Sequence, residues 1–339
     1  MKNKKTASAL CLALTAAAFF SAPALAADEL LVPVGQAVGI ELRFRGVAVT
    51  GLAEVDTAEG PVCPAREAGL RSGDVINSFN GQRIEGSSDF LEKAASLGPD
   101  SVRLGVTRSG RELGFIVTPA RSAQGTWQLG LWLRESVQGV GTVTFYDPAT
   151  GAFGALGHGV SLPDGQGPAE ISGGSITAAG VADVVPGRPG EPGELCGVPD
   201  GSRVLGAVEQ NTPQGIFGTA SAPLANAAAL PVAADSQIHV GSAAIIATVD
   251  GRGPRQFEVE IVRVDRSGGE TRQLTIEVTD PALLGATGGI VQGMSGSPIV
   301  QSGMLVGAVT HVLVSDPARG YGISMENMLK ASRELAQAA

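Results

Sequence analysis

The chain has 339 residues, of which 43% are apolar and only 4% aromatic, and its 24 basic and 33 acidic side chains leave a net charge of −9. This length is enough for two domains, and the acidic balance excludes binding to nucleic acid through general electrostatic attraction. The 48 glycines and 20 prolines predict many short strands joined by turns.

Residues 1–26 have the pattern of a secretory signal peptide. Three lysines precede an apolar run over 7–20, and 24–26 reads Ala-Leu-Ala, a small-x-small cleavage site. The run is shorter than the roughly 20 residues that cross a bilayer, which favours cleavage over an uncleaved signal anchor. We therefore expect an exported protein that is secreted, or held at the membrane only by this segment.

Residues 30–120 are predicted to form one small α+β unit. The run Ala-Gly-Leu-x-x-Gly-Asp-Val-Ile at 68–76 resembles the PDZ domains attached to bacterial proteases. Other parts also predict short elements: strands at 39–42 and 46–49, a short helix from 64, an Asn80-Gly81 hairpin, a helix over 89–97 capped by Ser87 or Ser88, and paired strands at 102–106 and 113–117.

PDZ domains bind an extended peptide as an added strand. The resemblance places that peptide-binding stretch at Gly39, Ile40, Glu41 and Leu42. In the alternative, the PDZ unit binds no peptide, packs against the rest of the protein and regulates access to it.

A linker of small and polar residues over 121–129 leads to a second domain at 130–339. Polar and apolar residues alternate over 256–264 and 273–278, which predicts paired half-buried strands. Long helices do not alternate with these strands, so we expect a barrel or a pair of barrels and not a doubly wound sheet. The spacing of apolar residues over 325–338 predicts an amphipathic helix packed on the barrel.

A serine flanked by glycines occurs in the stretch 293–298, Gly-Met-Ser-Gly-Ser-Pro. Glycine permits backbone angles that turn successive N–H groups inward, where they can hold an oxyanion beside the Ser295 hydroxyl. A plain tight turn is the other interpretation. A serine nucleophile needs a base, and His158, which also lies between glycines, is a candidate. With Asp280 and Ser295 it gives the chain order His, Asp, Ser, which is the order of the chymotrypsin-type proteases.

Gly-x-Ser-Gly-x-Pro is similar to the nucleophile loop of chymotrypsin-like proteases, with Met294 where Asp is usual. A closer resemblance is to the stage IV sporulation protein B (SpoIVB) peptidase family, and it extends over nearly the whole chain after the signal segment. It is carried by the stretches 130–136, 141–148, 153–159, 287–298 and 307–312. The resemblance implies a mainly β protein, with a small PDZ domain followed by a chymotrypsin-like β-barrel serine peptidase domain.

The resemblance also implies site residues: Ser295 as nucleophile, His158 as base, Asp280 as the acid that orients it, and the N–H groups of Gly293 and Ser295 as the oxyanion hole. Asp280 lies only 15 residues before Ser295. Three other acids between His158 and Ser295 therefore stay open as alternatives, namely Asp164, Asp183 and Asp250.

Other serine, histidine and cysteine residues are weaker candidates for this chemistry. Ser297 also follows a glycine and is the less favoured nucleophile. His311 is an alternative base, but its apolar strand favours a buried structural histidine or a wall of the substrate pocket, and His239 is expected to face solvent or a turn. Cys63 and Cys196 fall in different predicted domains, which argues against a disulfide. No two histidines share a short spacing, so neither a metal site nor a cofactor is expected.

The family resemblance implies a serine endopeptidase that cleaves itself and a membrane-embedded regulatory protein in the space between the forespore membranes, and so triggers signalling during spore formation. Its partners would be protein or peptide substrates. The alternative from a different class is a non-catalytic PDZ scaffold whose protease-like domain only binds.

Overall fold

The computed structural model describes residues 29–163, 167–267, 269 and 271–336. The signal segment expected over 1–26 and Asp164 lie outside these residues. Within the described ranges, no helix combines the length and the apolar character needed to cross a membrane.

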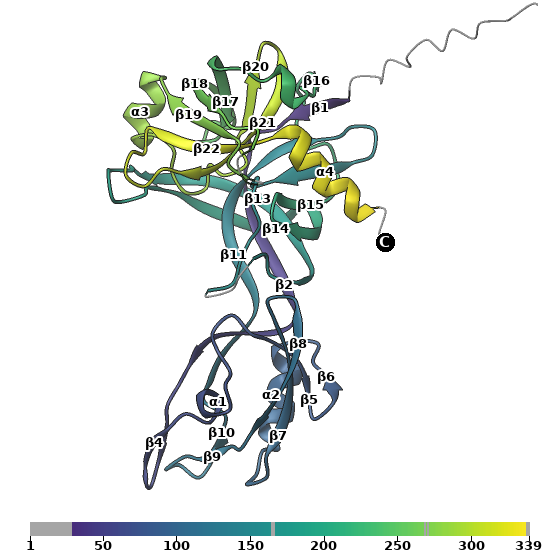
Figure 1. Ribbon diagram of the computed structural model, residues 1–339, viewed down its shortest axis with the longest axis vertical. Coiled ribbons are helices and arrows are strands. Elements are labelled where there is room, and N and C mark those ends of the chain that lie inside the picture. The colour runs from purple at the N-terminus through teal and green to yellow at the C-terminus, as the bar shows by residue number, and fades with distance from the viewer. Residues whose placement is uncertain (1–28, 164–166, 268, 270, 337–339) are drawn as a thin grey trace, which may run out of the picture.

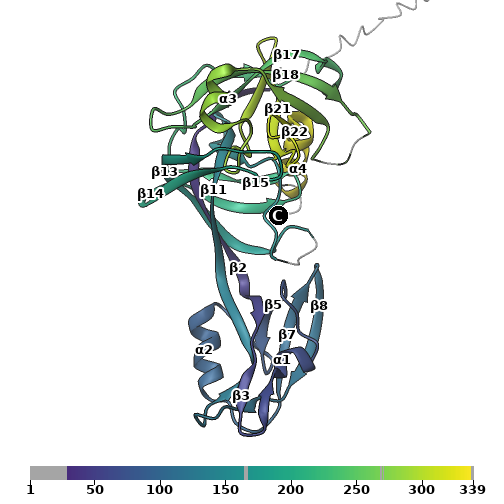
Figure 2. The ribbon, with the colours of Figure 1, turned by 90° about the vertical axis from the view of Figure 1, so that its left-hand side faces the viewer.

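Two long strands connect a larger and a smaller body (Figures 1 and 2). They are β2 (Ala37–Leu52) and β11 (Leu131–Tyr146), which pair antiparallel from Ala37 opposite Thr142 to Leu52 opposite Leu131. A strand advances about 3.3 Å per residue, so 16 residues are long enough to serve two hydrophobic cores.

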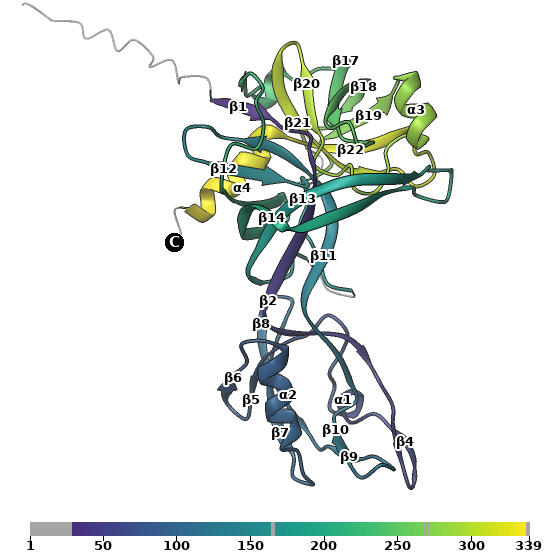
Figure 3. The same cartoon turned by 180° about the vertical axis from the view of Figure 1, so that it is seen from behind.

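In the sequence, the smaller body is an insertion between these two strands. In space it lies at their far ends, as the view from behind also shows (Figure 3). The expected domain boundaries are wrong at both ends. Residues 38–44 of β2 pair with β13 of the larger body, and Leu131 and Leu133, expected in the second domain, pack on the core of the smaller one. The physical reason is that β2 and β11 each cross from one core to the other.

The first barrel of the larger body is closed by a ring of pairings, β2–β11–β12–β15–β14–β13–β2. Along β2, Leu42 and Phe44 are buried while Arg43 and Arg45 are exposed, so one face of the strand forms the barrel core. The other strands are β12 (Ala152–Ala155), β13 (Ile171–Val185), β14 (Glu194–Thr212) and β15 (Gly215–Ala220), with β1 (Leu30–Pro33) and β16 (Leu230–Pro231) at the margin.

The second barrel is also closed, in the order β17–β18–β19–β22–β21–β20. The alternation expected over 256–264 is confirmed, since Phe257, Val259 and Ile261 are buried and Glu258 and Glu260 are exposed. Its strands are β17 (Gly241–Ala247), β18 (Arg255–Val264), β19 (Leu274–Val278), β20 (Pro298–Gln301), β21 (Met304–Val312) and β22 (Arg319–Ser324), preceded by a 3-10 turn at Asp235–Gln237.

Two helices accompany this barrel, α3 (Pro281–Thr287) and α4 (Met325–Ala336). The amphipathic C-terminal helix is confirmed: Met328 and Leu329 of α4 are buried in a cluster with Phe145 and Phe217 of the first barrel and Leu305 of the second. The helix therefore packs across the seam between the two barrels (Figure 1).

The smaller body packs α2 and α1 against a short sheet around a core that includes Phe79, Phe90 and Leu104. The Asn80-Gly81 hairpin is confirmed, with φ values of 49° and 81°. Its elements are β3 (Val55–Thr57), β4 (Gly60–Val62), α1 (Pro64–Glu67), β5 (Val75–Phe79), β6 (Gln82–Arg83), α2 (Ser87–Ala95), β7 (Val102–Arg108), β8 (Arg111–Val117), β9 (Ala120–Arg121) and β10 (Trp127–Gln128).

The expected serine cap of α2 is wrong. Gly86 is the N-cap residue and makes no side-chain hydrogen bond. The N–H of Ser87 donates instead to the carboxylate of Glu135 on β11, at 2.9 Å. A carboxylate beside a helix N-terminus is favourable because the helix dipole is positive there.

The expected fold class, mainly β with barrels and a small α+β unit, is confirmed. Cys63 is buried and Cys196 half-buried, and both are free thiols.

Candidate active site

Ser295 lies in a tight turn that enters β20 of the second barrel. Gly293 and Gly296 on either side have φ values of +93° and +97°, in the region that favours glycine. A Cβ on Gly296 would also lie 2.0 Å from the carbonyl oxygen of Thr142. Met294, where Asp is usual, is fully buried in the core of the second barrel and anchors the turn.

Strand β11 and the start of β14 hold this turn from outside the second barrel. Thr142 on β11 donates through its hydroxyl to the Gly293 carbonyl at 2.8 Å and through its N–H to the Ser295 carbonyl at 3.0 Å. The N–H of Leu195 on β14 donates to the carbonyl of Gln292 at 2.9 Å. Within the described part of the chain, the N–H groups of Gly293 and Ser295 donate no hydrogen bond.

His158 follows β12 of the first barrel, after a turn in which Leu156 and Gly157 have φ values of 70° and 68°. Its Nδ1 lies 2.9 Å from the carbonyl oxygen of Gly159. A carbonyl only accepts hydrogen bonds, so Nδ1 carries the proton and Nε2 of the neutral ring has the free lone pair. Burial lowers the pKa of His158 below its usual value, and the Gly159 carbonyl partly opposes this effect.

The structure brings Ser295 and His158 to the same cavity, one from each barrel. No hydrogen bond joins their side chains among the described residues: the Ser295 hydroxyl donates to the carbonyl of Thr310 at 2.7 Å. His311 follows Thr310 directly, and its ring lies 4.7 Å from that of His158 between centroids. Burial, and then the charges of His158 and Arg272, lower the pKa of His311 to about 4.

Asp280 does not meet His158. It is the N-cap of α3, and its carboxylate accepts hydrogen bonds from the backbone N–H groups of Ala282, Leu283 and Glu258 at 2.8, 3.2 and 3.3 Å. Desolvation, the largest single influence, would raise the pKa of Asp280, but the three N–H groups and Arg255 together outweigh it, so the pKa is lowered. The expected triad acid is thus a helix cap, which is also what an Asp before a proline commonly does.

The described alternatives to Asp280 and Ser295 are also engaged elsewhere. Asp183 accepts from the N–H of Val184, and Asp250 pairs with Arg252 and Arg255. Ser297 is fully buried and its hydroxyl donates to the Met294 carbonyl.

A cavity of about 250 Å³ opens beside Ser295 and His158. Two of the residues expected to bind a peptide in the PDZ domain line it, Ile40 and Leu42. The assignment of Gly39, Ile40, Glu41 and Leu42 to a PDZ site is therefore wrong, because this half of β2 belongs to the first barrel.

The smaller body has a groove elsewhere, between α2 and the segment 127–133. It has a volume of about 510 Å³ and is lined by Phe90, Leu91 and Trp132 among others. Leu91 and Trp132 are 65% and 66% exposed, which is unusual for large apolar side chains. The sequence signal for this groove is the run Leu-Gly-Leu-Trp at 129–132, which spans the end of the predicted linker and the start of the stretch that resembles the peptidase family.

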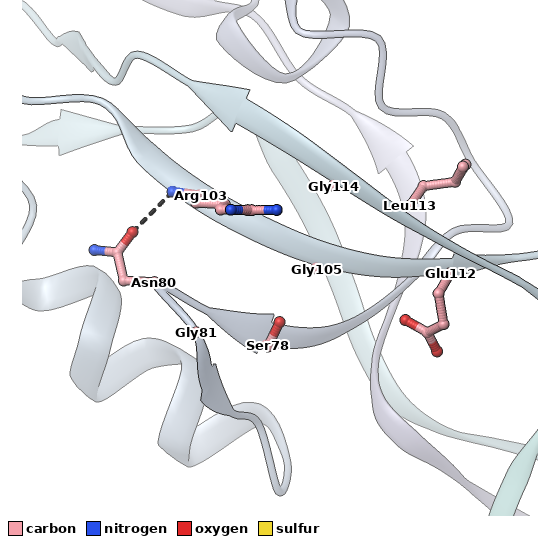
Figure 4. A pocket seen from close by; sticks show the side chains of 8 residues that line it. All are labelled: Ser78, Asn80, Gly81, Arg103, Gly105, Glu112, Leu113 and Gly114. Carbon is pink, nitrogen blue, oxygen red and sulfur yellow. Dashed lines mark hydrogen bonds between the residues drawn. The ribbon is translucent and has the colours of Figure 1, made fainter.

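Figure 4 shows a second hollow of the smaller body, of about 660 Å³, on the outer face of its sheet. Gly105 and Gly114 are cross-strand partners there, and the N–H of Arg103 donates to Asn80. None of its lining residues was predicted as a site residue. His239 is exposed, as expected, with its Nδ1 near the Gln237 carbonyl, and no cluster of potential metal ligands occurs within the described ranges.

Comparison with known protein families identifies both parts of the chain. A family model described as SpoIVB peptidase S55 matches residues 125–329, which is more than half of the chain, and a PDZ domain model matches residues 55–108. The second match falls within the inserted body.

Individual relatives match over shorter stretches. The chain is 44% identical over 80 residues to a "probable periplasmic serine endoprotease DegP-like" of Bartonella henselae, which covers 23% of this chain and 14% of that protein. Among solved structures, it is similar to the PDZ domain of an SdrC-like protein of Listeria monocytogenes (22% identity, 26% of this chain, 88% of that one, TM-score 0.22). It is also similar to the HtrA-type protease AlgW with decapeptide (12% identity, 90% and 65% covered, TM-score 0.34).

Proposed function

Because the chain belongs to the SpoIVB peptidase S55 family, we propose that it is a serine endopeptidase in which Ser295 is the nucleophile and His158 the general base. The observation that carries the proposal is the convergence of Ser295 and His158, from different barrels, on one cavity. A site assembled between two closed barrels can hold both groups rigidly, which is what nucleophilic catalysis requires.

The reaction begins when the Ser295 hydroxyl leaves the Thr310 carbonyl and turns to Nε2 of His158. His158 takes the proton as the oxygen attacks the peptide carbonyl, and later gives it to the leaving amine. The Gly159 carbonyl keeps the ring in the required tautomer, a task that a carboxylate performs in the usual triad.

The N–H groups of Gly293 and Ser295 stabilise the tetrahedral oxyanion. Both are free of other hydrogen bonds within the described residues, and both belong to a turn fixed by Thr142. Donors that are oriented before the reaction stabilise developing charge without reorganisation, and losing one typically costs about 10²- to 10³-fold in rate.

The groove between α2 and segment 127–133 is the proposed peptide-binding site of the PDZ domain. Segment 131–133 of β11 pairs with β2 on one side and borders the groove on the other, so a peptide could add there as a strand. This groove would receive a substrate or regulatory peptide outside the catalytic cavity.

The biological setting that we propose follows the family resemblance. The protein would be exported, cleave itself and cleave a membrane-embedded regulatory protein during spore formation. The Ser295 hydroxyl donates to the Thr310 carbonyl and not to His158, and this favours a second candidate function. In it, the protein is a PDZ scaffold whose barrels bind a protein partner without cleaving it.

The deciding experiment compares the purified protein with its Ser295→Ala variant, using self-cleavage on a gel and labelling by a fluorophosphonate probe. We expect labelling and cleavage in the natural chain and neither in the variant. The matched control is Ser297→Ala, which should still label because the Ser297 hydroxyl is buried. A folded natural chain that neither labels nor cleaves, with or without peptides added for the PDZ groove, would establish the scaffold instead.

A further inference from the structure

Gly139, which has no side chain, is one of the residues that line the cavity beside Ser295 and His158. In the β2–β11 ladder Gly139 lies directly opposite Ile40, as Val137 lies opposite Leu42. Directly opposite residues direct their side chains to the same face of a sheet. Gly139 is exposed, and a Cβ built on it would meet no heavy atom within 4 Å, so a larger side chain has room at this position beside the cavity.

The lining of this cavity, which we call the Gly139 pocket, is apolar. Among the described residues, no Asp, Glu, Lys or Arg lines it, His158 is its one ionisable side chain, and Gln138 and Gln292 are its two amides. Among the residues that line it, five are aliphatic and lie on this face or beside His158: Ile40, Leu42, Val137, Leu156 and Val160.

The pocket also has a suitable size and position. Its volume is about 250 Å³, several times the roughly 30 Å³ that one water molecule occupies in the liquid, so a branched aliphatic side chain can enter. Ser295 and Gly293 lie on its rim, so a side chain in the pocket belongs to a residue close to the bond under attack.

We propose that the Gly139 pocket binds an aliphatic side chain of the peptide substrate next to the scissile bond and selects residues of leucine size. This inference rests on the proposed function, whose substrate class it specifies. Each methylene group that a hydrophobic pocket receives is worth roughly 10- to 200-fold in specificity. A charged side chain would be buried there without a partner, which is strongly unfavourable.

The test uses short alanine-serine peptides, blocked at both ends, that carry one Leu, Ala, Lys or Glu. Blocked ends prevent capture of a terminal carboxylate by the PDZ groove. We expect kcat/KM for the Leu peptide to exceed that for the Ala, Lys and Glu peptides by about 10-fold or more.

A matched pair of glycine variants ties this preference to the pocket. Gly139→Val places a branched side chain in the free space, and Gly139 has no positive φ that would make the change strained. Gly180→Val is the control, because Gly180 lies exposed on β13 and also has open space for a Cβ. Gly139→Val should lower the Leu/Ala ratio of kcat/KM by about 10-fold or more, and Gly180→Val should leave it unchanged.

Failure of this inference can be distinguished from failure of the proposed function. Fluorophosphonate labelling without a Leu preference, or an unchanged ratio in Gly139→Val, would overturn the pocket assignment and leave the peptidase standing. If the natural chain does not label, peptide binding still tests the pocket assignment. The measurement is the dissociation constant of each of the same peptides for the Ser295→Ala variant, by fluorescence anisotropy. Tighter binding of the Leu peptide that is lost on adding Gly139→Val supports the pocket, and equal binding of all four peptides overturns it.

Discussion

At the scale of single residues, the site differs from the usual triad in what orients the histidine. His158 hydrogen-bonds a backbone carbonyl, and the nearest described aromatic neighbour is a second imidazole, that of His311. The Gly159 carbonyl is itself fixed, because the N–H of Gly159 donates to Pro213 and the N–H of Val160 donates to the side chain of Asn211. A neutral acceptor can therefore keep the ring orientation without a charged partner.

For Asp280 we expect a structural effect that a conservative replacement restores. Asp280→Ala removes the acceptor of two N–H groups of α3, which typically costs about 0.5–2 kcal/mol of stability, whereas Asn also caps helices well. Urea unfolding and kcat/KM should therefore be near those of the natural chain for Asp280→Asn. If Asp280 were the triad acid, Asp280→Asn would lose about 10⁴-fold in kcat with little change in stability.

The pH dependence of the reaction should reflect buried histidines. A lowered pKa keeps His158 neutral, and hence active as a base, at pH values where an ordinary histidine with a pKa near 6.5 would be protonated. The rate of fluorophosphonate labelling should hold its plateau below pH 6.5 and fall only in more acid solution. An acid limb centred at or above 6.5 would contradict the buried geometry of His158.

The same histidines affect stability in the same pH range. In the unfolded chain the His311 side chain has the ordinary histidine pKa near 6.5, whereas in the folded chain its pKa is about 4. Stability should therefore fall as the pH decreases from 6.5 toward 4, because the unfolded state then holds more protons. Replacement by glutamine at His311 should flatten this part of a plot of urea midpoint against pH.

At the scale of elements, β11 is the strand that contributes residues to both proposed sites. Its first residues, 131–133, border the PDZ groove, residues 137–140 line the Gly139 pocket, and Thr142 holds the nucleophile turn. A displacement along or across this strand would therefore reach the turn of Ser295 directly.

Two threonines of β11 provide a matched test of that contact. Thr142 and Thr144 are both fully buried, but the Thr142 hydroxyl donates to the Gly293 carbonyl while the Thr144 hydroxyl has no partner among the residues that the structure describes. Thr142→Val should cost about 1–3 kcal/mol in urea unfolding and slow the labelling of Ser295, because a carbonyl is left unsatisfied. Thr144→Val should be neutral or stabilising, and equal effects of the two variants would contradict this account.

At the scale of the whole molecule, the PDZ domain is an insertion within the first barrel. Leu52 and Leu131 are cross-strand partners at the end of the ladder within the smaller body, so the chain leaves and re-enters the ladder at one place. Each body has its own hydrophobic core, and a small cluster around Val75 and Leu162 joins them beside β2. This arrangement lets a peptide-binding unit be added without opening either barrel.

The mainly β class, the barrels, the C-terminal helix and the Asn80-Gly81 hairpin could be predicted from the sequence, because each depends on local periodicity or turn chemistry. Short glycine-bounded motifs and the family resemblance also predict Ser295 and His158 as site residues, and the two line one cavity. The family model matches residues 125–329, a range that contains both motifs, so motifs far apart in the sequence identified one family.

The remaining features were decided only by tertiary structure. Whether Asp280 orients a histidine or caps a helix depends on which backbone N–H groups surround it, and both roles suit the same sequence. Gly39 to Leu42 form a strand in either domain, and only the partners of that strand assign it to the first barrel. Local sequence specifies the conformation of a segment, but strand pairing between residues about 100 positions apart specifies the cavity to which its side chains belong.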